Sequence, residues 1–267
     1  MSQEELAIGF FVLIAVVPVV GFLIWSRKTP FDPFRAFWYL VTILLARILW
    51  RAKVPPMPVP PGQGAVVVSN HRGSVDPFFI ALGTNRHIHW MVAREYCRHP
   101  AFGWFLRLCE VIPVNRGGID TASTKRAIRL ASEGGLVGVF PEGRINMTDK
   151  FMLPGRPGAI LVALKARVPI VPCFIQGSPY DRTPWSPFLM RAKVIVRFGE
   201  PIDLSPYYDR ERDAGLVGQL MLEAIKAIAG LAGREDFEPS LAGRRWKPTE
   251  EEVDRDMAAS LRLQSEQ

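Results

Sequence analysis

Two residues five positions apart, His71 and Asp76, are the pair in this sequence best suited to acid–base chemistry. The ordinary pKa of histidine lies nearest to neutrality, so a carboxylate that orients the ring makes it a general base for a hydroxyl group. The buried-looking run 65–69 precedes the pair and predicts a strand, and Asp76-Pro77 with the apolar run 78–82 predicts a helix start. The pair therefore lies on a strand-to-helix loop, where α/β proteins place chemistry. Group transfer to an alcohol is the predicted reaction.

Asp76 has a second, purely structural interpretation. An aspartate before a proline is typical of a helix N-cap, in which the carboxylate accepts a backbone N–H and proline occupies the first helical position. The two roles are compatible, because one carboxylate oxygen can cap the helix while the other holds a histidine nitrogen.

Three further motifs make the His71 region specific: Val111-Ile112-Pro113-Val114-Asn115-Arg116, Phe140-Pro141-Glu142-Gly143-Arg144 and Val168-Pro169-Ile170-Val171-Pro172. With the loop containing His71 and Asp76, and in this order and spacing, they resemble the four sequence blocks of the glycerolipid acyltransferase family. The resemblance covers roughly residues 65 to 205.

The resemblance implies a role for each matching residue. His71 would activate a glycerol hydroxyl for attack on an acyl thioester, and Asp76 would orient it. The residues implied to bind the glycerol phosphate acceptor are Arg116, Glu142, Gly143 and Arg144. Arg94 stands where the family often has a lysine that contacts the acceptor phosphate. Arg144 directly follows Gly143, a shorter form that is also similar to the tafazzin-like branch, so lysophospholipid and glycerol 3-phosphate acceptors stay open.

The placement of the three arginines makes physical sense. A guanidinium matches phosphate oxygens with paired donors. Arg94, Arg116 and Arg144 each follow an apolar strand-like run, so parallel strands would deliver all three to one edge of a sheet. Glu142 would accept a glycerol hydroxyl or pair with an arginine there, and a purely structural ion pair is the alternative.

The remaining histidines and the cysteines predict no metal site. His87, His89 and His99 share no metal-ligand spacing with His71, and no cluster of cysteines or carboxylates accompanies them. Three scattered cysteines among apolar neighbours are typical of reduced thiols. No bound cofactor is expected, and the resemblance implies acyl-CoA or acyl carrier protein as the acyl donor.

The N-terminal segment predicts a membrane anchor. Residues 6–25 carry no charge and, as a helix, would reach about 30 Å, the thickness of a bilayer core. Glu4 and Glu5 precede the run and no small-residue cleavage site follows it, so it does not resemble a secretory signal. The basic residues after it place the following domain in the cytoplasm. The second apolar stretch, 34–50, contains two arginines and predicts an interfacial helix or an amphipathic helix packed on the domain.

Strand-like runs alternate with helical patterns, among them one near 95–108, and residues 206–232 predict a further helix. This alternation predicts an α/β fold with a largely parallel sheet covered by helices, preceded by the N-terminal membrane-anchoring helix pair. We expect transmembrane and interfacial helices over 1–53, a catalytic domain over 54–233 that begins with a proline-rich spacer, and a charged C-terminal tail over 234–267 with a short helix near 249–261.

The net charge is +7 overall and +10 over residues 1–233, which suits anionic lipid headgroups. No basic helix or aromatic sheet motif indicates nucleic acid.

These observations predict an enzyme that moves a fatty acyl group from a thioester to lysophosphatidic acid at a phospholipid bilayer. The enzyme rivals are a lysophospholipid or tafazzin-like acyltransferase and a glycerol-3-phosphate acyltransferase. The rival of a different class is a non-catalytic lipid-binding membrane protein.

Overall fold

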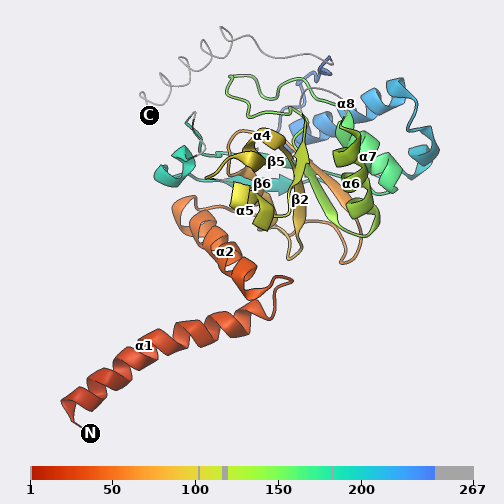
Figure 1. The fold of residues 1–267 in the computed structure, drawn as a ribbon. Helices are drawn as coiled ribbons and strands as arrows, with labels where there is room; N and C mark the ends of the chain where they lie inside the picture. Colours follow the sequence, from red (N-terminus) through yellow and green to blue (C-terminus); the bar gives the residue numbers. More distant parts are fainter. Residues whose placement is uncertain (1, 102, 116–119, 182, 184, 244–267) are drawn as a thin grey trace. The chain divides into compact units, whose positions relative to one another are not determined.

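The computed structural model of the chain describes residues 2–101, 103–115, 120–181, 183 and 185–243. By their internal contacts, the residues divide into two compact units, Met1–Leu45 and Ala46–Gln267 (Figure 1). Residues 46–53, which the sequence analysis grouped with the anchor, belong to the second unit, where Trp50 is fully buried. The helix expected near 249–261 lies outside the described residues.

The first unit consists of two apolar helices, α1 (Gln3–Ser26) and α2 (Pro33–Leu44). Ser2 and Glu5 form a capping box at the start of α1, and the Asp32 side chain caps α2 with Pro33 in the first turn. Trp25 stacks on Tyr39 with ring centroids 6.3 Å apart, which joins the two helices. Among the described residues, α1 and α8 (Ala214–Leu231) are long and apolar enough to cross a bilayer, but α8 packs in the core of the second unit. The apolar helix α1 therefore suggests association with a membrane.

The second unit is built on a six-stranded sheet in the order β3-β2-β4-β1-β5-β6. Five strands run parallel, and β6 pairs antiparallel with β5. All five residues of β1 are fully buried, as expected for a central parallel strand that is covered on both faces. The strand bounds are β1 Ala65–Ser69, β2 Ile88–Ala93, β3 Ile112–Val114, β4 Leu136–Val139, β5 Ile170–Gln176 and β6 Ile195–Phe198.

Helices cover both faces of this sheet. On one face, α6, α7 and α8 pack against β4, β1 and β5, and their apolar side chains form the main hydrophobic core. On the other face, α3 contacts β5 and α4 contacts β2 and β3. The predicted α/β class with a largely parallel sheet is therefore confirmed. The remaining bounds are η1 Leu45–Leu49, α3 Asp76–Ala81, α4 Arg94–Arg98, α5 Gly103–Leu108, α6 Thr121–Ser132, α7 Gly158–Ala166, η2 Ser186–Leu189 and η3 Ser205–Arg210.

Two predicted helices are shorter than the sequence pattern indicated. The helix expected over 95–108 is divided into α4 and α5, because Pro100 has no N–H and forces extended backbone on His99. The helix expected over 206–232 starts only at Ala214, after the 3₁₀ turn η3, where the Asp213 side chain accepts the Leu216 N–H.

Because β1 to β5 are parallel, their C-terminal ends share one edge of the sheet, called the C-terminal edge below. The segments that follow these strands begin at Asn70, Arg94, Asn115, Phe140 and Gly177. The residues predicted to carry the chemistry therefore start from the same edge.

Candidate active site

His71 and Asp76 are in direct contact on the loop between β1 and α3. His71 Nδ1 lies 2.9 Å from Asp76 Oδ2, and the Asp76 side chain is fully buried while 14% of the His71 side chain is exposed. A carboxylate only accepts hydrogen bonds, so Nδ1 carries the hydrogen of the neutral ring and Nε2 keeps its lone pair. The pair therefore has the geometry of an oriented general base.

Asp76 closes its own loop rather than capping the helix. Its Oδ2 also accepts the backbone N–H groups of Arg72 at 2.7 Å and Gly73 at 2.9 Å, and Val75 is the N-cap residue of α3 with no side-chain cap bond. The predicted capping role is therefore wrong in its partners, because the carboxylate points back along the loop. These two bonds fix the loop in the shape that brings His71 and Asp76 together.

Ser178, which follows β5, hydrogen-bonds the second oxygen of the Asp76 carboxylate. Its hydroxyl donates to Asp76 Oδ1, and a side chain at Gly73 would collide with Ser178 Oγ. Sequence reasoning missed Ser178, because it lies 102 residues from Asp76 and belongs to none of the four motifs. What the sequence does offer is the position of Ser178 two residues after the run that forms β5, the parallel neighbour of β1.

The His71 ring lies on an aromatic stack. The Phe140 ring is 3.9 Å away with an interplanar angle of 8°, and Trp90 stacks on Phe140 at 4.6 Å. Phe140 directly follows β4, the neighbour of β1, and Trp90 pairs with Gly138 in the sheet. A Cβ at Gly138 would lie 2.4 Å from the Trp90 ring, so this position has to be glycine. The stack limits the orientations of the imidazole and covers one of its faces.

Glu142 is buried and binds backbone amides. It is 1% exposed; Oε1 accepts the His71 N–H at 2.8 Å and Oε2 accepts the Leu153 N–H at 2.8 Å. Burial raises the pKa of Glu142 to about 8, and the hydrogen bonds from Leu153 and His71 oppose this shift. Both oxygens are occupied, so the geometry supports a role in positioning His71 rather than the direct acceptor contact expected from the sequence.

Replacing Glu142 with glutamine is expected to destabilise the fold by about 1 to 3 kcal/mol, because the amide NH₂ would face a backbone N–H that needs an acceptor. The pH dependence should change too. The folded state holds the Glu142 proton more tightly than the unfolded chain, so this group's contribution to stability is present below pH about 4.5 and is lost as the pH rises to about 8.

Melting temperatures of the detergent-solubilised chain between pH 5 and 8 test both statements. Glu142→Gln should melt lower at pH 5 and lose part of the wild-type decline toward pH 8. Identical pH profiles for the two proteins would contradict the assignment.

The predicted phosphate-binding residues have different surroundings. Arg94 starts α4 at the C-terminal edge, and its Nη2 lies 3.1 Å from Asp120 Oδ2, with 42% of the side chain exposed. Arg144 follows β4 at the same edge and is half-buried. Gly143 has a φ of +69°, which favours glycine. Arg116 lies outside the described residues. Arg94 and Arg144 thus come from the edge that carries His71, as their strand positions predicted.

Additional polar residues hold the His71 loop, and the sequence analysis did not identify them. The Asn70 side chain bonds both the N–H and the carbonyl of Ile175, which joins the ends of β1 and β5. Asn146 donates its N–H to the His71 carbonyl at 2.7 Å, and Arg72 Nη1 donates to the Thr148 carbonyl at 2.8 Å. The backbone of His71 is therefore held on both sides by the segment that follows β4.

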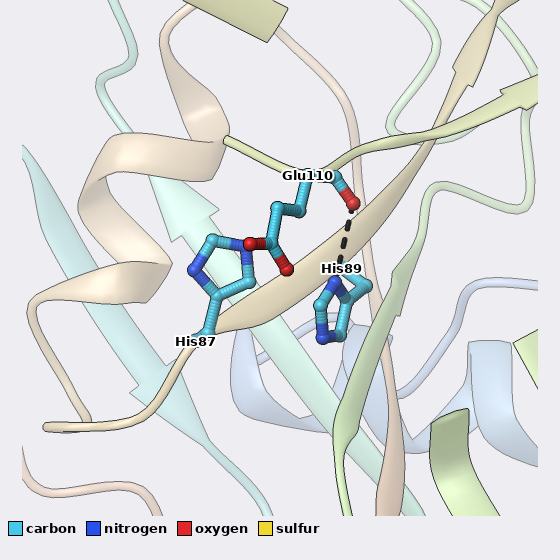
Figure 2. A group of neighbouring side chains, drawn as sticks. All are labelled: His87, His89 and Glu110. Carbon is cyan, nitrogen blue, oxygen red and sulfur yellow. Dashed lines mark hydrogen bonds between the residues drawn. The ribbon is translucent and has the colours of Figure 1, made fainter. Parts of the chain in front are cut away.

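A second cluster of titratable groups, His87, His89 and Glu110, lies at the opposite edge of the sheet (Figure 2). Their potential ligand atoms lie within 4.8 Å of one another. His87 Nε2 is 2.8 Å from the Cys109 carbonyl and His89 Nδ1 is 3.2 Å from the Glu110 carbonyl. A carbonyl only accepts, so these two nitrogens carry hydrogens, and the other nitrogen of each neutral ring keeps its lone pair. The two hydrogen bonds tie the start of β2 to the residues before β3.

Comparisons with known proteins agree with this geometry. The family model described as Acyltransferase matches residues 53–176. A 1-acyl-sn-glycerol-3-phosphate acyltransferase of Bacillus subtilis is 29% identical over 166 residues, which cover 61% of this chain and 80% of the relative. The protein of the same name from Streptococcus pneumoniae is 29% identical over 193 residues, covering 67% and 68%.

The fold has a counterpart among solved structures. The crystal structure of the 1-acyl-sn-glycerophosphate (LPA) acyltransferase PlsC from Thermotoga maritima matches with a TM-score of 0.55 and 20% identity, and the match covers 92% of this chain and 98% of that one. The match to the family model spans the loop of His71 and Asp76, the Phe140 stack and Glu142. Residues 53–176 therefore match the Acyltransferase family, and the chain is an enzyme of the acyltransferase type.

Proposed function

We propose that this acyltransferase transfers a fatty acyl group from a thioester to the free hydroxyl of lysophosphatidic acid, which forms phosphatidic acid for phospholipid synthesis. The observation that carries the proposal is the 2.9 Å contact between His71 Nδ1 and Asp76 Oδ2 at the C-terminal edge. The names of the two bacterial relatives support lysophosphatidic acid as the acceptor.

In the proposed mechanism, His71 Nε2 takes the proton of the acceptor hydroxyl as that oxygen attacks the thioester carbonyl carbon. The new C–O bond forms a tetrahedral oxyanion, which collapses when the C–S bond breaks. The imidazolium returns its proton to the departing thiolate, so an ester and a free thiol are the products. Asp76 stabilises the imidazolium through Nδ1, and burial of the carboxylate strengthens this interaction.

We assign the acceptor phosphate to the arginines of the C-terminal edge. Arg144 and Arg94 provide guanidinium groups there, and Asp120 orients the Arg94 side chain. Arg116 follows β3 in the sequence and completes the proposed set. Gly143 permits the turn that leads from Glu142 to Arg144.

The donor in this proposal is acyl-CoA or acyl carrier protein, and no bound cofactor takes part. The positive charge of residues 1–233 suits the phosphates of CoA, an acidic carrier surface and anionic lipids. We further propose that α1 anchors the chain in the bilayer and that the second unit lies on the cytoplasmic face, since Arg27 and Lys28 follow α1 directly.

A panel of acceptors tests the substrate assignment. Thiol release from acyl-CoA and from acyl carrier protein is measured with lysophosphatidic acid, lysophosphatidylcholine and glycerol 3-phosphate. We expect kcat/KM for lysophosphatidic acid to exceed that for lysophosphatidylcholine by about 10-fold or more, since each charged hydrogen bond to the terminal phosphate contributes about 1.5 to 3 kcal/mol. A preference for lysophosphatidylcholine would instead favour the tafazzin-like alternative, and a preference for glycerol 3-phosphate would identify the first acylation step.

A further inference from the structure

The connection between β5 and β6 exposes large apolar side chains to solvent. Leu189 is 89% exposed, Trp185 is 53% exposed and Phe188 is 36% exposed, all within or beside the short turn η2. Exposed apolar side chains that gather in one place indicate a surface with a partner, since scattered single residues are the norm elsewhere.

Trp50 holds this turn in place. The Trp50 ring is fully buried, and its Nε1 donates to the Pro187 carbonyl at 2.9 Å. Its centroid lies 5.8 Å from that of Phe188, which in turn lies 6.4 Å from Trp185. The exposed side chains are therefore presented by a fixed scaffold in the second unit.

Exposed basic residues lie in the two segments that form and support the turn. Backbone bonds pair residues 50–53 with residues 194–196: Val194 N–H donates to the Trp50 carbonyl at 3.1 Å, and Lys53 N–H donates to the Val194 carbonyl at 2.8 Å. The two segments that contain these pairs, residues 46–57 and 185–198, include no acidic residue. Their exposed basic residues are Arg47, Arg51, Lys53, Arg191 and Lys193.

The connection that contains η2 starts at the C-terminal edge, where His71 also lies. Ser178 stands at the start of the β5–β6 connection and donates to Asp76. Ile48, which belongs to the same unit and is 73% exposed, lies two residues before Trp50. We call the surface formed by Ile48, Trp185, Phe188, Leu189 and these five basic residues the β5–β6 patch.

We propose that the β5–β6 patch docks the second unit on an anionic bilayer surface. The apolar side chains enter the headgroup region, where tryptophan is favoured, and the basic residues bind lipid phosphates. A second copy of the chain fits this surface less well, because a symmetric interface would bring two basic patches together. The inference rests on the proposed function, since a lysophospholipid acceptor that resides in the bilayer would then reach His71 without leaving the membrane surface.

The test uses the full chain in proteoliposomes that contain phosphatidylglycerol, with two acceptors assayed in parallel. One is a long-chain lysophosphatidic acid embedded in the vesicle, and the other is a short-chain analogue that stays monomeric in water. Leu189→Glu should raise the apparent KM for the embedded acceptor by about 10-fold, because it replaces the most exposed apolar side chain with a charge that the lipids repel. The kcat with the soluble analogue should be unchanged.

Two further variants make the result specific. Ser132→Glu adds the same charge at an exposed position at the C-terminal end of α6, beside the opposite edge of the sheet, and should behave as wild type with both acceptors. Arg191→Gln combined with Lys193→Gln should raise the KM for the embedded acceptor in phosphatidylglycerol vesicles and have little effect in neutral ones.

Several outcomes would overturn the proposal. They are an unchanged KM for the embedded acceptor in Leu189→Glu and in the double variant, equal losses with both acceptors, or a change of oligomeric mass without a change on vesicles. Wild type that acylates neither acceptor would refute the proposed function instead, so the two failures are distinguishable.

Discussion

Replacing His71 with alanine is expected to lower kcat for acyl transfer by about 10² to 10⁴, which is the range that general-base catalysis supplies. The imidazole is the group whose Nε2 is left with a lone pair by the Asp76 contact, and its ring is only 14% exposed. Release of free thiol from acyl-CoA, measured at saturating acceptor, reports kcat directly.

The His71 variant should stay folded, because the bonds that hold its backbone do not involve the ring. The His71 N–H donates to Glu142 and its carbonyl accepts from Asn146, and alanine keeps both groups. Circular dichroism and the melting temperature of the variant are therefore the controls. A folded His71→Ala protein that keeps more than about a tenth of the wild-type kcat would rule out the role of general base.

Replacing Asp76 with asparagine is expected to cost nearly as much, about 10² to 10⁴ in kcat, although the side chain keeps its shape. The asparagine oxygen can still accept the N–H groups of Arg72 and Gly73, so the loop should close as before. The oxygen that accepts these two N–H groups is also the one that accepts Nδ1–H, so the lost feature is the negative charge that stabilises the imidazolium. The same thiol-release assay measures the loss.

Ser178→Ala serves as the matched control for Asp76→Asn. It removes one hydrogen bond to the same carboxylate and leaves the charge in place, so its kcat should fall by about 10-fold or less, in line with about 0.5 to 1.5 kcal/mol for one hydrogen bond. Full activity in Asp76→Asn would show that the charge has no part in the reaction. A loss in Ser178→Ala as large as in Asp76→Asn would show that orientation alone is responsible.

Much of the fold was predictable from the sequence because the sheet is parallel and central. Strands such as β1 are buried on both faces, so they appear as continuous apolar runs, and their ends are marked by polar residues and glycine. The placement of Arg94 and Arg144 at the same edge as His71 followed from the same alternation of strands and helices. Helix boundaries were less accurate, since Pro100 and η3 interrupt patterns that are otherwise apolar at helical spacing.

The inner surroundings of His71 were only partly predictable. The contact with Asp76 is local and could be expected from five-residue spacing on one loop. Ser178 and Leu153 act across long sequence separations, and nothing in their residue types signals the contacts that they make. In the sequence, Phe140 and Trp90 resemble any aromatic residues of a hydrophobic core. Their stacking with the imidazole depends on the register between β2 and β4.

Glu142 shows that a residue identified from a motif can have a structural role that the sequence does not reveal. The sequence identified it as unusual because a carboxylate follows a buried strand. The structure gives that carboxylate two backbone partners, one of them the N–H of His71. The physical demand at this position is an acceptor for buried amides, and substrate contact is left to the neighbouring residues in our proposal.

A double-mutant cycle on kcat shows whether His71 and Asp76 act as one unit on the acceptor hydroxyl. His71→Ala, Asp76→Asn and the double variant are compared with wild type in the thiol-release assay. If the carboxylate acts only through the imidazole, the double variant should be no slower than His71→Ala alone. Losses that multiply, so that the double variant is slower by the product of the two single effects, would show that the two side chains act independently.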